Sequence, residues 1–347
     1  MSVKWYEKSG DLGDIVVSTR IRLARNLEQC PFPSRLNAEQ RKVINSLFED
    51  AMKKGNSTIA NDFDFISLEE LNPFEARSMA ERHLISPEFA ARPEGHGVIL
   101  NKDNSIALML CEEDHLRLQV LSPGLALNKS YELAEKIESL LSETLNFAFS
   151  QRYGYLTECP TNLGTGLRAS VMLHLPALEQ VGGIQSLSKT LSKVGFTLRG
   201  TYGENSGALG SLYQLSNQLS LGIDEYTALE NLKGITHQVI EQEKAAREKL
   251  DEMAIWDKVF RSYGILKNAR ILSSKEFFEH ISNIRLGISM GIISDISIET
   301  VFKDQSKENH CRCQPSNHCF KVEDKHLVAK GQRKQNSKYH NKHSENM

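Results

Sequence analysis

Apolar residues recur at helical spacing in several segments of the chain, and these segments predict its helices. Residues 38–54 place Val43, Ile44, Leu47 and Phe48 on one face. The strongest signal covers 130–150, where Ser130 can cap the helix. Its apolar stripe comprises Leu133, Ile137, Leu140, Leu141 and Leu145. The segments 234–250 and 251–300 keep the same helical rhythm, so we expect helices there too.

Other segments carry the patterns of strands. Residues 169–175 alternate between apolar and polar side chains with a period of two, which indicates a half-buried strand. Short apolar runs at 15–18, 105–110 and 116–121 are also read as strands. Strands and helices follow one another without a steady β-α-β alternation. This order favours an α+β fold over a doubly wound sheet.

Composition is that of a soluble globular protein, but it changes near residue 301. The chain has 347 residues, 40% of them hydrophobic and 25% charged, with a net charge of −2. No apolar run reaches the roughly 18 residues that a membrane span needs, and we see no secretory signal. Six cysteines in a chain of this length favour free thiols in a reducing cytoplasm over a disulfide framework.

The C-terminal segment 302–347 stands apart from the rest of the chain. It holds ten basic and five acidic residues and has no periodicity, which is typical of a disordered tail. The composition therefore predicts a basic tail that is separate from the rest of the chain. The stretch "HCRCQPSNHC" (310–319) has metal-ligand residue types, but its spacing fits no zinc module well.

A glycine-rich turn and nearby arginines indicate an anion site. Gly164 and Gly166 have the G-x-G-x-x-A spacing of a dinucleotide loop, but a strand rather than a helix follows them. No P-loop motif occurs, so a turn between strands is the simpler interpretation. Arginines stand beside this turn, other turns and strand ends, namely Arg20, Arg22, Arg117, Arg168 and Arg199. Several guanidinium forks in such positions are suited to phosphate oxygens.

Four motifs resemble those of the ATP:guanidino phosphotransferases, which include arginine and creatine kinases. They are "STRIRLAR", "EEDHLR", "CPTNLGTGLRAS" and "RGTYGE", in that order. The resemblance covers about residues 14 to 250 and implies a catalytic domain there. It also implies that a helical dimerisation or regulatory domain begins at 251–301, before the basic tail. "ERHLISPEFA", "SVMLHLPAL" and Tyr202, where kinases of free guanidino compounds usually carry arginine, are similar to the bacterial protein-arginine kinases. The motif at Ser18 also leaves no room for the helical domain that precedes it in free-guanidino kinases, and a site without that domain could admit an arginine on a protein.

The resemblance implies a fold, a nucleotide site and cofactors. The fold would be an antiparallel β-sheet flanked by helices, of the glutamine-synthetase-like kind, followed by a helical C-terminal segment. ATP, with Mg²⁺, would lie across the sheet, and His83 would stack on its adenine. The residues implied at the nucleotide are Ser18, Thr19, Arg20, Ile21, Arg22, His83, Arg117, Arg168, Ala169, Ser170, Val171, Met172, Arg199, Gly200, Thr201, Tyr202, Gly203 and Glu204.

The resemblance also implies the catalytic groups. An arginine guanidinium has a pKa above about 12, so it must lose a proton as its nitrogen bonds to phosphorus. Glu113 is the expected general base, with Glu204 across the guanidinium and Cys159 in a supporting, non-covalent role. Glu112 and Asp114 could serve the fold or the water shell of the metal, and the sequence leaves both options open. Cys111 stands where the family often has asparagine.

We expect a protein-arginine kinase acting in stress response and protein quality control. The alternatives are a free-guanidino kinase, and a non-catalytic regulator that binds arginine-rich or phosphoarginine proteins. The resemblance implies arginine-bearing protein substrates, among them a stress-response transcriptional repressor, with a zinc-binding activator protein and a Clp protease as partners. A homodimer is possible, and no membrane or direct nucleic-acid partner is expected. The R-D-x-x-R-A motif of phosphoarginine sensing does not occur, so a truncated or frame-shifted C-terminus is our interpretation of the tail.

Overall fold

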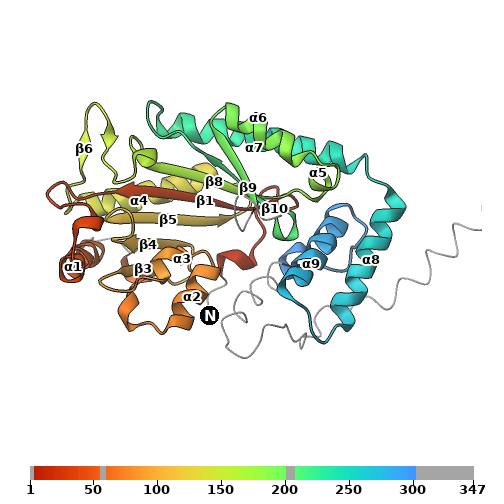
Figure 1. Ribbon diagram of the computed structural model, residues 1–347, viewed down its shortest axis with the longest axis horizontal. Coiled ribbons are helices and arrows are strands. Elements are labelled where there is room, and N and C mark those ends of the chain that lie inside the picture. The colour runs from red at the N-terminus through yellow and green to blue at the C-terminus, as the bar shows by residue number, and fades with distance from the viewer. Residues whose placement is uncertain (1–3, 55–59, 201–207, 302–347) are drawn as a thin grey trace, which may run out of the picture.

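The computed structural model describes residues 4–54, 60–200 and 208–301. Its centre is an eight-stranded sheet in the order β2-β3-β4-β5-β1-β8-β10-β9 (Figure 1). Every neighbouring pair of these strands is antiparallel. The strands are β1 (Val16–Arg25), β2 (Phe63–Ser67), β3 (Gly97–Asn101), β4 (Ile106–Leu110), β5 (Leu116–Pro123), β8 (Leu167–His174), β9 (Phe196–Gly200) and β10 (Leu212–Asn217). A separate hairpin pairs β6 (Phe149–Ser150) with β7 (Gly154–Tyr155).

Helices lie on both faces of the sheet and extend beyond one end of it. They are α1 (Ala38–Lys54), α2 (Pro73–Glu81), α3 (Pro87–Ala90), α4 (Leu127–Ser142), α5 (Pro176–Gln180), α6 (Ile184–Lys193), α7 (Glu225–Arg247), α8 (Glu252–Asn268) and α9 (Ser274–Ser289). Figure 1 shows α8 and α9 at one end of the sheet, with α5 and α7 leading towards them. None of the helices in the described ranges is long and apolar enough to cross a membrane.

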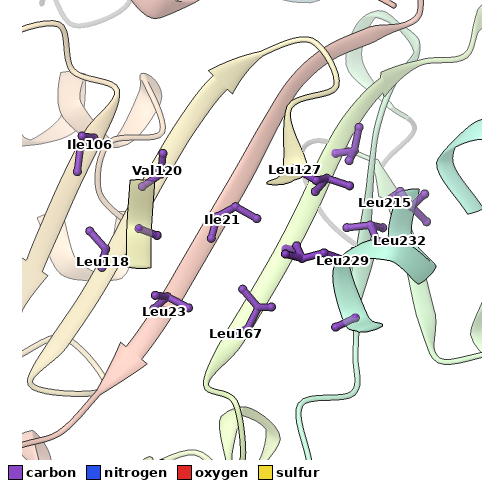
Figure 2. Packing of buried hydrophobic residues seen from close by; sticks show 14 of the residues in the cluster. Ile21, Leu23, Ile106, Leu118, Val120, Leu127, Leu167, Leu215, Leu229 and Leu232 are labelled. Carbon is purple, nitrogen blue, oxygen red and sulfur yellow. The ribbon is translucent and has the colours of Figure 1, made fainter. Parts of the chain in front are cut away.

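The main core lies between the sheet and the helices α4 and α7. Alternate residues of the central strands point into it, as Ile21 and Leu23 of β1 do beside Leu167 of β8 (Figure 2). Leu229 and Leu232 of α7 cover them from the helix side. Burying one such side chain contributes about 1.5–3 kcal/mol. The opposite side chains of the same strands are thereby directed to the other face of the sheet.

The C-terminal helices have a small core of their own. Ile255 and Val259 of α8 pack against Phe277, Ile281 and Ile284 of α9. These are the residues whose helical rhythm the sequence showed. The boundary at 251 that we expected from the sequence remains a prediction, and the basic tail 302–347 lies outside the described residues.

Comparison with the predicted elements confirms the mixed antiparallel fold and corrects details. The helix at 38–54 forms as predicted, but Val43 and Leu47 are 63% and 42% exposed and lie outside the core. The helix predicted at 130–150 was wrong at both ends. It begins at Leu127, because the Thr19 hydroxyl of β1 accepts a hydrogen bond from the Ala126 N–H at 3.0 Å. It ends at Ser142, and residues 149–150 belong to β6.

Candidate active site

The central strands carry an arginine-rich face opposite the main core. Alternation along β1 places Ser18, Arg20 and Arg22 on this face, while Ile21 and Leu23 are buried on the other. The β1–β8 register sets Arg168 opposite Arg22 and Ser170 opposite Arg20. We call this surface the arginine face. It joins residues about 150 positions apart in the sequence through β-pairing alone.

Neighbouring strands extend the arginine face on both sides. On β5, Gln119 lies opposite Arg22, and Arg117 is two residues away on the same side. On β10, Gln214 lies opposite both Met172 of β8 and Arg199 of β9. The Gln214 side-chain oxygen accepts a hydrogen bond from Arg20 Nη2 at 2.6 Å. The sheet therefore fixes the direction of Arg20 before any ligand arrives.

A cavity of about 500 Å³ opens over this face, between the sheet and the segment from α2 to α3. Arg20, Arg22, Arg117 and Ser170 form its floor, and His83 lies in its wall. This volume falls in the range of small-molecule sites. The cavity thus combines a cationic floor with a histidine at its side, which suits an anionic ligand that carries a flat ring.

The arginine face is electrostatically unfavourable without an anion. Burial and the charges of Arg117 and Arg168 lower the pKa of Arg20 to about 10. Burial and the charges of Arg20, Arg117 and Arg168 lower the pKa of Arg22 further. Among the described residues, the buried Nε atoms of Arg22 and Arg168 have no hydrogen-bond partner. Two unpaired donors among crowded cations are the surroundings that phosphate oxygens would neutralise.

His83 is held in place by its backbone. Its φ of 58° lies in the left-handed region, where a histidine is uncommon but tolerated. Its carbonyl accepts a hydrogen bond from Gln119 Nε2 at 2.8 Å, which ties the α2–α3 segment to the sheet. His83 is exposed at the cavity wall, but neighbouring protein groups that displace water from its ring, together with the charge of Arg20, lower its pKa to about 4. The imidazole is therefore neutral at physiological pH and can stack on a ring without adding charge.

The acidic residues in the turn after β4 have different partners and different roles. Glu112 forms an ion pair with Arg117 and accepts a hydrogen bond from the Ser86 hydroxyl, so it orients an arginine of the cavity. Buried Asp114 accepts hydrogen bonds from Asn26 Nδ2 and from the Glu158 N–H, at 2.6 and 2.8 Å. Burial raises the pKa of Asp114 despite these donors. Asp114 therefore holds the turn to the end of β1 and to the loop between β7 and β8. This loop carries Gly164 and Gly166, and we call it the glycine loop.

Glu113 and Cys159 lie together at the edge of the arginine face. The Glu113 side chain is exposed, and its carboxylate accepts a long hydrogen bond of 3.4 Å from Asn162 Nδ2. Cys159 Sγ lies 3.0 Å from the hydroxyl of Thr161. Burial lowers the pKa of Arg168, whereas the charges of Cys159 and Glu113 act to raise it. Cys159 and Glu113 are therefore close enough to Arg168 to interact with it electrostatically. A carboxylate and a thiol thus border the cations.

Cys111 precedes these acids in a constrained conformation. Its φ is 60°, in the region that asparagine adopts more readily than most residues. Burial raises the pKa of this thiol to about 12, so it is protonated and unreactive. A cysteine at this position therefore affects the backbone of the turn and adds no charge beside Glu113.

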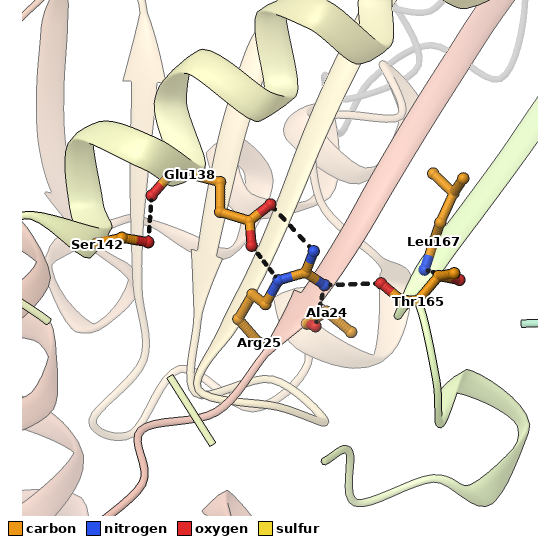
Figure 3. A network of polar contacts seen from close by, with 6 residues as sticks. All are labelled: Ala24, Arg25, Glu138, Ser142, Thr165 and Leu167. Atoms are coloured by element: carbon orange, nitrogen blue, oxygen red, sulfur yellow. Dashed lines mark hydrogen bonds and ion pairs between the residues drawn. The ribbon is translucent and has the colours of Figure 1, made fainter. Parts of the chain in front are cut away.

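The glycine loop is anchored by a buried arginine on the core side of β1. Arg25 donates two hydrogen bonds to the Glu138 carboxylate of α4, at 2.5 and 3.0 Å, and one to the Thr165 carbonyl at 3.0 Å (Figure 3). Its guanidinium carbon lies 3.5 Å from the centroid of the Tyr155 ring. Gly166 has a φ of 61°, and a Cβ there would lie 2.6 Å from Arg25 Nη1. The loop therefore needs glycine at this position to pass the arginine.

The remaining residues of the implied nucleotide set lie in different places. Thr19, Ile21, Ala169 and Val171 are buried on the core side, so their side chains do not reach the cavity. Met172 lines the cavity, and Gly200 ends β9. Thr201, Tyr202, Gly203 and Glu204 lie outside the described residues. Sequence reasoning did not select Gln119, Gln214 or Ser86. The strand period could have indicated Gln119, because it lies two residues from Arg117.

Two family models match the chain, one after the other. The model of the ATP:guanido phosphotransferase C-terminal catalytic domain matches residues 43–246. The model of the protein-arginine kinase McsB C-terminal domain matches residues 252–327. The second match continues past residue 301, where the composition changes. The boundary between the two matches falls between α7 and α8.

Similar proteins and structures agree with these matches. A protein-arginine kinase of Halothermothrix orenii is 48% identical over 295 residues, which is 84% of each chain. One from Brevibacillus brevis is 46% identical, covering 84% of this chain and 83% of that protein. The duplicated taurocyamine kinase of Schistosoma mansoni, with bound transition state analog components, is 28% identical with a TM-score of 0.61, over 71% of this chain and 36% of that one. Lombricine kinase shares the fold, with a TM-score of 0.60 at 24% identity over 68% of each chain. This chain belongs to the ATP:guanido phosphotransferase family, in the branch that carries the McsB C-terminal domain.

Proposed function

We propose that the protein is a protein-arginine kinase, which transfers the γ-phosphoryl group of ATP to arginine side chains of proteins. The arginine face carries this proposal, because it gathers four guanidinium groups from three adjacent strands. Arg20, Arg22 and Arg117 line the cavity, and among the described residues the buried Nε atoms of Arg22 and Arg168 have no hydrogen-bond partner. The relatives at 48% and 46% identity that bear this name support the choice of a protein-bound acceptor.

In the proposed reaction, a guanidinium nitrogen of the substrate attacks the γ-phosphorus. The bond from that phosphorus to the β–γ bridging oxygen breaks, and ADP leaves. The proton of the attacking nitrogen passes to Glu113, whose exposed carboxylate stands beside Cys159 and Arg168. Glu204, which lies outside the described residues, is the proposed second carboxylate on the guanidinium. Cys159 would help to orient the cation without forming a covalent bond.

The arginine face would stabilise the transition state mainly by charge. In phosphoryl transfer, negative charge spreads over the equatorial oxygens of the transferred group. The protein positions the reactants and neutralises this charge. Arg22 and Arg168 have donors available for those oxygens, and Glu112 holds Arg117 in position. Losing one such donor costs on the order of 10²–10³ in rate. His83 would stack on the adenine as a neutral ring.

Mg²⁺ is a further proposal, and it would enter with the nucleotide. The described residues contain no group of three His, Cys, Asp or Glu side chains that could hold a metal. Glu112 is already engaged with Arg117 and Ser86. This donor set fits an ion held by phosphate oxygens and water, as Mg²⁺ prefers, rather than by a protein cage. When bound, the ion supplies additional neutralisation of the phosphates.

The finer biological role is also proposed. Substrates would include a stress-response transcriptional repressor, and a zinc-binding activator protein and the Clp protease system would be partners. The helical C-terminal region would support a homodimer. A cytoplasmic location agrees with Cys30, Cys111 and Cys159, which are all free thiols. Arginine phosphorylation would then act in stress response and protein quality control.

A labelling experiment tests the activity. The full chain is incubated with γ-labelled ATP and either free arginine or an arginine-bearing protein, and acid-labile label is measured. Label on the protein, lost in Glu113→Gln, is the expected result. Label on free arginine alone would make the chain a free-guanidino kinase, and no label at all would leave a non-catalytic regulator.

A further inference from the structure

Four exposed apolar side chains from three separate segments border the loop that carries Gly164 and Gly166. Leu219 and Leu221 are 59% and 53% exposed and flank the buried Ser220. Val194 and Phe149 are 55% and 59% exposed. We call these four residues the apolar rim. Single exposed apolar residues are ordinary on a protein surface, but a group along one loop indicates an interaction site.

Ser220 attaches the apolar rim to the loop that carries Cys159. Its hydroxyl oxygen lies 2.8 Å from the carbonyl oxygens of both Thr161 and Leu163. Its own carbonyl accepts a hydrogen bond from the Thr165 N–H at 2.9 Å. Thr161 in turn contacts Cys159 through its side chain. The rim is therefore fixed to the edge of the candidate active site.

The other two members of the rim are continuous with these leucines. Leu219 packs over Gly195, next to Val194, because a Cβ on that glycine would lie 3.0 Å from Leu219 Cδ1. On the other side, a Cβ on Gly164 would lie 2.8 Å from the Leu221 Cα. Gly164 pairs with Tyr155, whose ring contacts Phe149 edge-on, with the centroids 5.2 Å apart. The glycine loop thus has apolar side chains on both of its sides.

We propose that the apolar rim binds apolar side chains that flank the acceptor arginine in an extended segment of a substrate protein. This inference rests on the proposed function, because only an arginine within a polypeptide has flanking residues. An extended chain advances about 3.3–3.6 Å per residue. Residues two or three positions from an arginine held between Glu113 and Cys159 are therefore within reach of the surface around the glycine loop. Apolar side chains there gain from contact with Leu219 and Leu221, since both surfaces leave water.

Two peptides and one double variant test the proposal. One peptide has leucine and valine around a single arginine, and the other has glycine and serine there. For the full-length wild type, we expect a lower KM for the apolar peptide. In Leu219→Ser/Leu221→Ser, the KM for the apolar peptide should rise about ten-fold, equal to about 1.4 kcal/mol. The kcat, the KM for ATP and the KM for the glycine–serine peptide should stay unchanged.

The control changes two apolar residues on another surface. Val43→Ser/Leu47→Ser alters exposed side chains of α1 and should leave both peptide KM values unchanged. Equal KM values for the two peptides, or a double variant that matches wild type, would overturn the inference and leave the kinase activity intact. A double variant whose sedimentation shows fewer subunits than wild type would instead make the rim a contact between copies of the chain. Failure of the wild type to phosphorylate either peptide would count against the proposed function itself.

Discussion

Arg22→Met is expected to make the nucleotide-free protein more stable and nearly inactive. Arg22 is half-buried and crowded by Arg20, Arg117 and Arg168, and among the described residues only the charge of Glu112 acts to raise its pKa. The same kind of surroundings moves the pKa of Arg20 from 12.5 to about 10. Because a pKa unit corresponds to about 1.4 kcal/mol, holding Arg20 charged costs the folded state about 3 kcal/mol.

The sign of this effect follows from the direction of the shift. A lowered arginine pKa means that the charged form is less favourable in the folded than in the unfolded protein. The penalty is fully present at neutral pH, and it is relieved only as pH rises through the folded-state pKa, about 10 for Arg20. Removing one charge should relieve a similar amount, less about 1 kcal/mol for lost side-chain packing. We expect Arg22→Met to gain about 1–2 kcal/mol in unfolding free energy.

Urea unfolding at neutral pH, with and without ATP, measures both effects. Wild type should gain about 2.7 kcal/mol when ATP is present at 100 times its Kd. Arg22→Met should gain much less, and its kcat should fall on the order of 10²–10³. Arg22→Lys is the matched control, because it keeps the charge but loses the guanidinium fork. It should lose activity without becoming more stable.

Destabilisation of nucleotide-free Arg22→Met by more than about 1 kcal/mol would refute this reasoning, because the packing of the Arg22 side chain would then outweigh the repulsion between the crowded cations. An unchanged stabilisation by ATP in the same variant would show that Arg22 does not contact the phosphates. The lysine variant separates the two failures, because it changes hydrogen-bond geometry with the charge in place.

Three further predictions concern other parts of the site. Glu113→Gln should lower kcat about 10²–10⁴-fold in a phosphoryl-transfer assay and leave the urea midpoint unchanged, because this carboxylate is exposed. Arg25→Met should cost about 3–5 kcal/mol in urea unfolding, since it leaves the Glu138 carboxylate of α4 buried without its ion pair; a cost under about 1 kcal/mol would contradict this. For His83→Phe, we compare the KM for ATP with that of wild type from about pH 5.5 to 8. The ratio of the two KM values should stay constant, because the pKa of His83 is about 4 and the ring is neutral throughout this range. A change in the ratio centred near pH 6.5 would contradict this.

Alternation within strands explains much of what the sequence could predict. The spacing of Arg20 and Arg22 placed both on one face of a strand, and the structure has them there. The same period places Thr19 and Ile21 on the opposite side, where Ile21 is buried in the core. A motif match assigns every residue of a segment to the site. A strand, however, directs alternate side chains to opposite faces of the sheet, so only half of them face the cavity. Only the backbone of the core-side residues is available to a ligand.

Contacts between distant segments account for what the sequence could not predict. The first turn of α4 depends on Thr19, which is 107 positions from Ala126 and gives no local signal. The roles of Glu112 and Asp114 remained open in the sequence because both are acids in one turn. The structure separates them by their partners, which are Arg117 for Glu112 and Asn26 for Asp114. No local pattern distinguishes an acid that orients an arginine from one that fastens a turn.

The C-terminal helices are joined to the strands of the arginine face by buried polar contacts. His174, at the end of β8, lies with its Nε2 2.8 Å from the Ser282 hydroxyl of α9. Arg285 of α9 donates a hydrogen bond to the Gly13 carbonyl, just before β1, at 2.8 Å. Each buried group left without such a partner costs about 1–3 kcal/mol. A displacement of α9 must therefore break contacts with β8, which carries Arg168, and with the segment just before β1, which carries Arg22.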